Sequence, residues 1–210
     1  MTDAEGLLEF RNRVLKKSGV LDFQGERVLD LGCGDGLDTH LLSRSFKECI
    51  GSDLQVHEGW GERVGNPSLK FLVANAHHPP LKKFMFDVIF MKDILHHSGD
   101  PENVLRGLQS VVKPGGVFVI VEANRYNPIF YVHMTQMLGH DHFTKRFFRR
   151  LILKVFPEDV VCFKEFEAHY FPTHNRILKA LIQFSETGLE RARIFKSFLS
   201  YNAAIVSCRE

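Results

Sequence analysis

The chain has 210 residues, which is enough for one sizeable domain and short for two. Hydrophobic residues make up 44% and charged residues 25%, and this balance excludes a disordered or fibrous protein. The formal charge of +2 gives no electrostatic argument for a nucleic-acid-binding protein, although it is compatible with a local basic patch. Phe and His are abundant, at 19 and 11 residues, and the histidines raise acid–base or metal chemistry as hypotheses to be tested position by position.

The N-terminal residues and the cysteines bear on where the protein resides. Met1–Gly6 lacks the basic and then apolar pattern of a secretory signal, and no run approaches the ~20 apolar residues that span a bilayer. The cysteines form no CxxC pair, as is typical of reduced thiols. They are Cys33, Cys49, Cys162 and Cys208. We expect a soluble, cytoplasmic protein without a transmembrane segment.

In chain order, the first predicted element is an amphipathic helix at Ala4–Lys17, which ends near Gly19. Five short apolar runs follow, of the kind that is buried in parallel sheets, with helix-like segments between them. One of these helices begins at Asp100, an N-cap followed by a proline, and stops at Pro114-Gly115-Gly116. The alternation of strand and helix predicts a doubly wound α/β fold. The runs are Arg27–Leu31, Glu48–Asp53, Leu69–Val73, Phe86–Met91 and Val117–Glu122.

The last third of the chain departs from this alternation. Residues 124–142 are polar and aromatic without a clear period, and a basic, aromatic helix follows at about Phe143–Phe156. Two further strands are predicted at Val160–Phe166 and near Ala203–Ser207, with a helix around Arg176–Ser185 between them. We therefore predict a single domain with a seven-stranded, mostly parallel, Rossmann-like sheet whose last strand is antiparallel.

The most informative stretch is a buried strand that runs directly into Asp30-Leu31-Gly32-Cys33-Gly34-Asp35-Gly36. Glycines are needed where the backbone turns sharply and comes close to a ligand. A dinucleotide site uses G-x-G-x-x-G to seat a pyrophosphate, but Leu37 occupies the position of its last glycine. Asp30 and Asp35 flank the turn and would repel a pyrophosphate. The stretch favours a cofactor that carries positive charge, and an ordinary strand–helix turn is the alternative.

Residues Asp30–Gly36 resemble, at every position, the first motif of class I S-adenosylmethionine-dependent methyltransferases, D-x-G-x-G-x-G. Phe84–His97 looks like the fourth motif of that family, and Lys113–Gly116 is similar to a turn that many members carry before the fifth strand. The resemblance covers about residues 25–123. It implies the fold and the cofactor S-adenosyl-L-methionine, with S-adenosyl-L-homocysteine as product, and it says little about the methyl acceptor.

Further positions fit the cofactor site that this resemblance implies. Asp53 ends the second strand, where an acidic residue can accept hydrogen bonds from both ribose hydroxyls, although a helix cap is the alternative for a lone aspartate. Asn75 follows the third strand where family members usually have Asp, and its amide carbonyl can accept the same hydrogen bond from the adenine amine. The expected cofactor-binding residues are Asp30, Gly32, Cys33, Gly34, Asp53, Leu54, Asn75, Ala76 and Lys92.

The expected parts of this methyltransferase domain are an N-terminal helix or cap, a cofactor-binding core, an acceptor-site insertion with its helix, and C-terminal strands with a helix. In that order they comprise residues 1–24, 25–123, 124–156 and 157–210. The helix in the insertion has basic and apolar residues interleaved over 145–154. A packing helix with a solvated basic side is the simpler interpretation, and contact with an anionic or lipid-linked acceptor or a membrane surface is the sharper one.

Catalysis of methyl transfer needs little chemistry from the protein. The reaction is an in-line displacement at a sulfonium, so that positioning and exclusion of water can suffice. A hydroxyl acceptor would benefit from a general base, and His96 and His97, just beyond the fourth strand, are the candidates, with a cap to the next helix as the structural alternative. His133, His140 and His142 lack the regular spacing of metal ligands, and no metal is expected.

The segment Glu122–Pro128 looks like the Glu-Pro-Asn-x-x-Asn-Pro stretch of some methyltransferases of quinone, lipid or polysaccharide pathways, although Ala123 departs from it. We predict methylation of a small molecule, on oxygen, with a quinone-precursor, lipid-linked or saccharide-type acceptor. A nucleic-acid methyltransferase is one alternative, but enzymes that methylate base amino groups often resemble Asn-Pro-Pro-Tyr where this chain has Lys92-Asp93-Ile94-Leu95. The second alternative is a non-catalytic cofactor-binding or partner subunit, because no motif in the sequence requires a particular catalytic residue.

Overall fold

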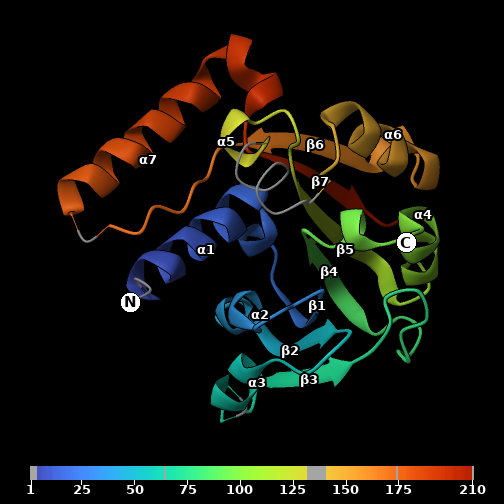
Figure 1. The fold of residues 1–210 in the computed structure, drawn as a ribbon. Coiled ribbons are helices and arrows are strands. Elements are labelled where there is room, and N and C mark those ends of the chain that lie inside the picture. The colour runs from blue at the N-terminus through green and yellow to red at the C-terminus, as the bar shows by residue number, and fades with distance from the viewer. Residues whose placement is uncertain (1–3, 64, 132–140, 174, 210) are drawn as a thin grey trace.

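The computed structural model describes residues 4–63, 65–131, 141–173 and 175–209, which are arranged around one twisted sheet (Figure 1). Its strands are β1 (Gly25–Leu31), β2 (Phe46–Asp53), β3 (Leu69–Val73), β4 (Phe86–Lys92), β5 (Val112–Ala123), β6 (Val161–Phe166) and β7 (Tyr201–Ser207). Among the described residues they form a seven-stranded sheet in the order β3-β2-β1-β4-β5-β7-β6. Strand β7 is antiparallel to both β5 and β6, and the other pairs are parallel. The predicted sheet is confirmed.

Strand β5 begins five residues before the apolar run that predicted it. Val112 already pairs with Phe86 of β4, and the pairing resumes at Val117 and Val88 after an irregularity. The residues between are the Lys113–Gly116 turn, which the sequence placed before the strand. A bulge of this kind leaves residues unpaired inside a strand, and glycine accommodates the backbone that it requires.

The helices cover both faces of the sheet. They are α1 (Ala4–Ser18), α2 (Leu37–Leu42), α3 (Glu58–Arg63), α4 (Pro101–Leu108), α5 (Pro128–Phe130), α6 (Lys145–Val155) and α7 (Arg176–Arg191), with short 3-10 helices η1 (Val20–Asp22), η2 (Leu95–His97), η4 (Glu158–Val160) and η5 (Arg193–Phe198). Helix α7 continues six residues beyond its predicted end at Ser185, and the hydroxyls of Ser185 and Thr187 donate to the Ile182 and Gln183 carbonyls within it. In the part of the chain that the structure describes, no helix combines the length and apolarity needed to cross a bilayer.

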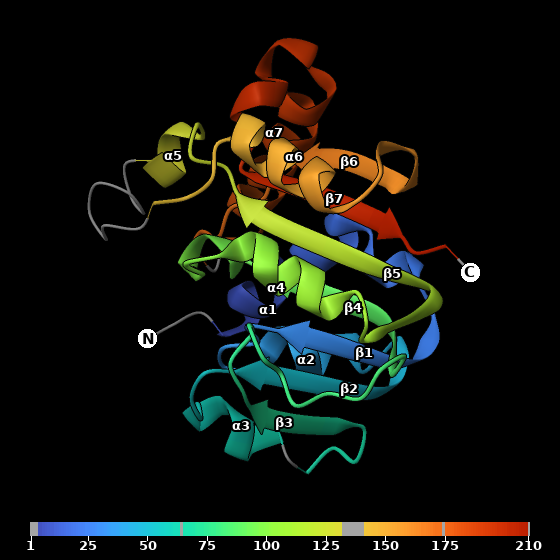
Figure 2. The ribbon, with the colours of Figure 1, turned by 90° about the vertical axis from the view of Figure 1, so that its right-hand side faces the viewer.

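Alternate residues of the strands point into two separate apolar clusters. On one face, Leu29 and Phe118 pack with α4 and α6, which lie in front of the sheet in Figure 2. On the other face, Val28 and Phe90 pack with α1 and α2. Because the strands are buried on both faces, their sequences are continuously apolar, as predicted. The order reverses between β1 and β4, and such a switch point opens a crevice at the carboxyl ends of the strands.

Helix α6 packs through the apolar face that its sequence predicted. Phe148 and Ile152 are fully buried against the sheet, and the Arg149 guanidinium lies 4.2 Å from the ring centroid of Phe163. Most of the apolar face that a membrane contact through 145–154 would need is therefore used by the core, although Phe147 stays 45% exposed. The packing interpretation of this helix fits the structure.

Candidate active site

A cavity of about 380 Å³ lies at the carboxyl ends of β1, β2, β3 and β4, where the switch point predicts a ligand. We call it the cofactor cavity. Five of the predicted cofactor-binding residues line it, and the predicted base His97 does so as well. The five are Gly32, Asp53, Leu54, Asn75 and Ala76. His77, in the loop after Asn75, is also in the lining, and its backbone N–H donates to Asn75 Oδ1 over 2.9 Å.

The glycine turn is held against β2 by backbone hydrogen bonds. The N–H groups of Gly32 and Cys33 donate to the Ser52 carbonyl over 2.7 and 3.1 Å. Gly32 has φ +75°, and a Cβ at this position would lie 2.6 Å from the side chain of Ile94. Gly34 also has a positive φ, but a Cβ there would meet nothing within 4 Å. The turn therefore needs glycine at residue 32 for both backbone and space.

Asp53 is fixed by the turn that it faces. Its Oδ2 accepts the Gly34 N–H over 2.8 Å, and its Oδ1 accepts the Leu54 N–H over 2.7 Å. Each carboxylate oxygen has a second lone pair, so the side chain can still accept from hydroxyl groups in the cavity. The geometry suits the ribose contact that the sequence predicted for this residue.

Four predicted cofactor-binding residues, Asp30, Cys33, Gly34 and Lys92, are not among those that line the cavity. Asp30 is buried beneath the turn, where its Oδ2 accepts the Thr39 hydroxyl over 2.6 Å. Burial, and then repulsion by Asp38, raises the pKa of Asp30 to about 7. The Lys92 ammonium lies 3.5 Å from Asp38 Oδ2. The Asp30 side chain thus lies beneath the glycine turn, and direct contact with the cofactor stays a prediction for all four residues.

A second cavity of about 530 Å³ adjoins the first, and we call it the acceptor cavity. Asp93 and His97 line both cavities. The remaining lining is mostly aromatic and imidazole rings, with His96 and Phe130 among them. The His96 ring contacts two other imidazoles at tilted angles, with its centroid 4.0 Å from that of His97 and 4.4 Å from that of His142. The structure thus places the predicted base His97 at the boundary between the cavities and His96 beside it in the acceptor cavity.

His96 is paired with a buried carboxyl group that the sequence did not single out as a catalytic partner. Glu122 Oε2 lies 2.6 Å from His96 Nδ1, and Glu122 Oε1 accepts the Leu95 N–H over 2.7 Å. Burial lowers the pKa of His96, while burial and then repulsion by Asp93 raise the pKa of Glu122 well above its ordinary value. His96 Nε2 is buried without a hydrogen-bond partner among the described residues. This leaves one ring nitrogen to meet a ligand.

Asp93 holds a negative charge at the same boundary. Its backbone has φ +54°, and its Oδ1 accepts the Ala123 N–H over 2.9 Å. Burial opposes ionisation, but the Lys92 ammonium, 3.4 Å away, and the Ala123 hydrogen bond hold the pKa of Asp93 below its ordinary value. Ligand atoms of Asp93, His96 and Glu122 lie within 4.8 Å of one another, so their spacing alone is compatible with a cation.

Of the three histidines that we considered as metal ligands from the sequence, the structure describes only His142. His142 is buried against His96, whereas Asp141 forms an ion pair with Arg125 at 3.1 Å. His133 and His140 lie outside the described residues. Asp141 and His142, although neighbours in sequence, thus contact different residues.

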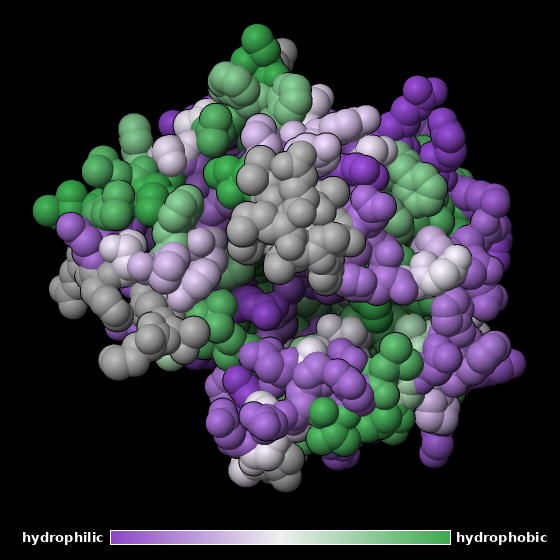
Figure 3. All heavy atoms as spheres, in the orientation of Figure 1, coloured by the Kyte–Doolittle hydropathy of each residue, from purple (hydrophilic) through white to green (hydrophobic). Residues whose placement is uncertain are grey.

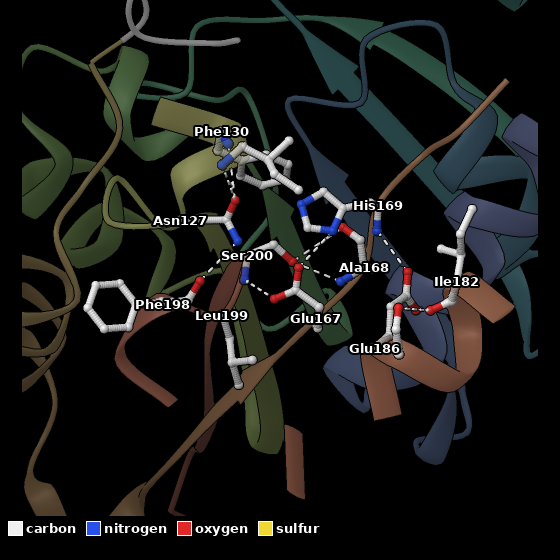
Figure 4. A network of polar contacts seen from close by, with 12 residues as sticks. Asn127, Phe130, Glu167, Ala168, His169, Ile182, Glu186, Phe198, Leu199 and Ser200 are labelled. Carbon is white, nitrogen blue, oxygen red and sulfur yellow. Dashed lines mark hydrogen bonds and ion pairs between the residues drawn. The ribbon is translucent and has the colours of Figure 1, made fainter. Parts of the chain in front are cut away.

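One functional candidate, His169, was missed because no motif surrounds it. Its Nδ1 lies 2.7 Å from Glu167 Oε1, and its ring lines the acceptor cavity (Figure 4). Its Nε2 is buried without a hydrogen-bond partner among the described residues. Both residues lie in the chain just after β6, so only the alternating Glu-Ala-His pattern could have signalled the pairing. His169 offers a further polar contact point in the acceptor cavity, beside Asp93 and His96.

The chemistry of the cofactor cavity separates two classes of cofactor. Its described lining includes the carboxylates of Asp53 and Asp93 and contains neither Lys nor Arg. A pyrophosphate would face these carboxylates without a compensating cation, whereas a sulfonium cofactor with a ribose diol would gain charge attraction and hydrogen bonds. The residues present fit S-adenosyl-L-methionine.

Comparison with known proteins finds likeness over about half of the chain. Residues 29–120 match a family model described as a methyltransferase domain. A ubiquinone biosynthesis O-methyltransferase of Cereibacter sphaeroides is 31% identical over 122 residues, which are 53% of this chain and 46% of that protein. The chain therefore spans about half the length of the curated relatives that it matches.

Solved structures of low sequence identity show the same fold. A SAM-dependent methyltransferase from Archaeoglobus fulgidus has a TM-score of 0.69 at 17% identity and covers 95% of this chain and 94% of its own. A Haemonchus contortus phosphoethanolamine N-methyltransferase 2 in complex with S-adenosyl-L-methionine has a TM-score of 0.65 at 15% identity, over 95% of this chain and 53% of its own. These structures share the fold of this chain, and the family match identifies residues 29–120 as a methyltransferase domain.

Proposed function

We propose that this protein transfers the methyl group of S-adenosyl-L-methionine to a hydroxyl group of a small, apolar acceptor in the acceptor cavity. The observation that carries the proposal is the boundary between the cavities, where Asp93 and His97 line both. Ligands in the two cavities would meet at this boundary. Of the acceptor classes that the sequence suggested, a quinone precursor or lipid-linked molecule suits the mainly aromatic lining better than a saccharide, whose hydroxyls need many polar partners.

The name of the Cereibacter sphaeroides relative supports the same acceptor class, since that protein is a ubiquinone biosynthesis O-methyltransferase. That likeness extends over about half of each chain, so the acceptor of this protein is argued from its own cavity. A panel of phenols and hydroquinones with apolar substituents tests the proposal, with release of S-adenosyl-L-homocysteine measured by mass spectrometry. Turnover of at least one panel member is expected. Tight cofactor binding without turnover of any would favour the non-catalytic alternative.

When bound, S-adenosyl-L-methionine supplies an electrophilic methyl group on a sulfonium, and the residues of this chain position and deprotonate the acceptor. The imidazole of His96 has Nδ1 engaged by Glu122, so Nε2 is the atom that can accept the acceptor's proton. The Glu122 carboxylate then stabilises the imidazolium. Asp93 keeps its negative charge beside the site and favours a positively charged cofactor there.

The aromatic residues around the His96–Glu122 pair have a separate role. Phe130 and Tyr201 line the acceptor cavity with His96 and His97, and their rings pack edge to face at 5.4 Å between centroids. Apolar walls exclude water, which strengthens the electrostatic interactions within the site and orients the acceptor. Positioning and water exclusion by these residues therefore accompany the proton transfer.

Asp53→Ala is expected to weaken S-adenosyl-L-homocysteine binding by about 1–3 kcal/mol, because the ribose hydroxyls and the Gly34 N–H lose their acceptor. Isothermal titration calorimetry measures this loss, and NAD serves as a ligand that the wild type should not bind. Glu62→Ala, which removes an exposed carboxylate from α3, is the matched control and should leave the affinity unchanged. Equal affinity in Asp53→Ala and the wild type would refute the assignment of Asp53.

A further inference from the structure

Helix α7 and η5 present an apolar surface to solvent, which we call the α7–η5 surface. Phe184, Ile194 and Ile177 are 79%, 78% and 73% exposed. Figure 3 shows hydrophobic side chains gathered over the part of the molecule that α7 occupies in Figure 1. A contiguous exposed apolar patch commonly marks an interaction site. The surface consists of Ile177, Leu178, Leu181, Phe184, Leu189, Ile194, Phe195 and Phe198.

The orientation of α7 is the reverse of that of an ordinary surface helix, because its carboxylates face the protein. Glu186 is buried and accepts the His169 N–H over 3.0 Å (Figure 4). It also pairs with Lys17 of α1 at 3.2 Å. Glu190 also pairs with Lys17, at 2.8 Å. These contacts hold the polar side of α7 inward. An amphipathic helix usually buries its apolar side instead, so the apolar side of α7 is left for another partner.

Polar contacts also fix η5, the second part of the surface. The side-chain amide of Asn127 donates to the Phe198 carbonyl over 2.9 Å, and that of Asn124 donates to the Ser197 carbonyl over 3.0 Å. Figure 4 shows the Asn127 contact beside the start of β7. Both asparagines belong to the segment after β5 that the sequence singled out. Their structural role here is to attach the apolar surface to the sheet.

The charges around the surface favour an anionic partner. Between residues 176 and 198 the sequence has five basic residues and two acidic ones. The two acidic residues are the inward-facing Glu186 and Glu190, whereas Arg191 and Lys196 are exposed. Exposed apolar side chains flanked by cations are the pattern of helices that lie in the interface of membranes with anionic lipids.

A large cavity connects this surface with the candidate active site. It measures about 700 Å³ and is lined on one side by Leu189, Ile194 and Phe198 of the α7–η5 surface. Three further lining residues, Ile129, His169 and Phe171, also line the acceptor cavity. An apolar molecule that leaves a bilayer at this surface would therefore enter space that adjoins the acceptor cavity.

We propose that the α7–η5 surface docks this protein onto a bilayer that contains anionic lipids. The apolar side chains enter the boundary between headgroups and acyl chains, and Arg191 and Lys196 contact the lipid phosphates. Docking goes beyond the proposed function and does not depend on it. Only its purpose, the delivery of an apolar acceptor, rests on that function.

The test is flotation of the full chain with vesicles of phosphatidylcholine alone or with one third phosphatidylglycerol. The wild type is expected to float with the anionic vesicles, more weakly at 0.5 M than at 0.1 M salt, since added salt screens the cationic contacts. Phe184→Glu should lower the bound-to-free ratio at least tenfold. Phe147→Glu, the same substitution at an exposed position of α6, should not change it and serves as the matched control.

Two controls keep the outcomes distinct. Circular dichroism and S-adenosyl-L-homocysteine affinity should match the wild type in both variants, because neither phenylalanine lines the cofactor cavity. Size-exclusion chromatography with light scattering tests a second copy as the occupant. Three results would overturn the proposal: no flotation of the wild type, equal flotation of Phe184→Glu, or a wild-type dimer that Phe184→Glu disperses. None of these results depends on whether methyl transfer occurs.

Discussion

Glu122→Gln is expected to lower kcat by about 10²–10⁴-fold with little change in cofactor affinity. Glu122 Oε1 accepts the Leu95 N–H, so the glutamine carbonyl must take that position. The amide NH₂ then faces His96 Nδ1 and donates to it, which places the ring proton on Nε2. In this tautomer His96 cannot accept the proton of the acceptor. Steady-state kinetics with a responsive acceptor and calorimetry with S-adenosyl-L-homocysteine measure the two quantities.

The pH dependence tells this effect from a general loss of structure. In the wild type the rate should rise with pH as the hydrogen-bonded Glu122 and His96 pair loses a proton and Nε2 becomes a base. Glu122→Gln and His96→Ala should both lack this acid limb, and His97→Ala should keep it, because the His97 side chain has no part in the pair. A wild-type profile in Glu122→Gln would show that the base lies elsewhere or that positioning alone carries catalysis.

Gly32→Ala is expected to destabilise the protein by about 2–5 kcal/mol. The positive φ of +75° costs an alanine about 1–2 kcal/mol, and a Cβ 2.6 Å from Ile94 adds about 1–3 kcal/mol of overpacking. Gly32 and Ile94 both line the cofactor cavity, so a displaced Ile94 narrows it. Affinity for S-adenosyl-L-homocysteine should fall more than about tenfold, which is at least 1.4 kcal/mol. Urea unfolding and calorimetry give the two values.

The variant Gly34→Ala separates the two causes of the stability loss expected in Gly32→Ala, the backbone conformation and the steric overlap. Gly34 also has a positive φ, of +51°, but a Cβ there meets no atom within 4 Å. Its loss of stability should be about 1–2 kcal/mol, the cost of the backbone alone. If the two variants lose the same stability, the contact with Ile94 has no part in shaping the turn.

The cofactor half of the site could be predicted from the sequence because its signals are local. A strand that ends in a glycine turn, followed by an acidic residue at the end of the next strand, can be recognised within a short stretch of sequence. Gly32 and Asp53 accordingly lie together at the carboxyl edge of the sheet. Asp30 belongs to the same motif, yet the structure buries it against Thr39, because alternate residues of a strand point to opposite faces.

The acceptor half could be predicted only in part. His96 was predicted from its place beyond β4, but its partner Glu122 comes from β5 and meets it only through the pairing of these strands. His169 reaches the same cavity from the chain after β6. Contacts between residues distant in sequence depend on how the strands are ordered in the sheet, and no local pattern encodes them.

The sequence by itself determined the seven strands, the glycine turn and the cofactor class, since burial on both faces and a tight turn each demand particular residues at particular spacings. Only the tertiary structure decided which carboxyl group pairs with His96 and which side of α7 faces solvent. The amphipathic pattern of α7 is visible in the sequence, but its inward side is set by Lys17 and His169, which bind Glu186 from distant parts of the chain. Long-range pairing of charges, rather than helix periodicity, leaves the apolar side of α7 exposed.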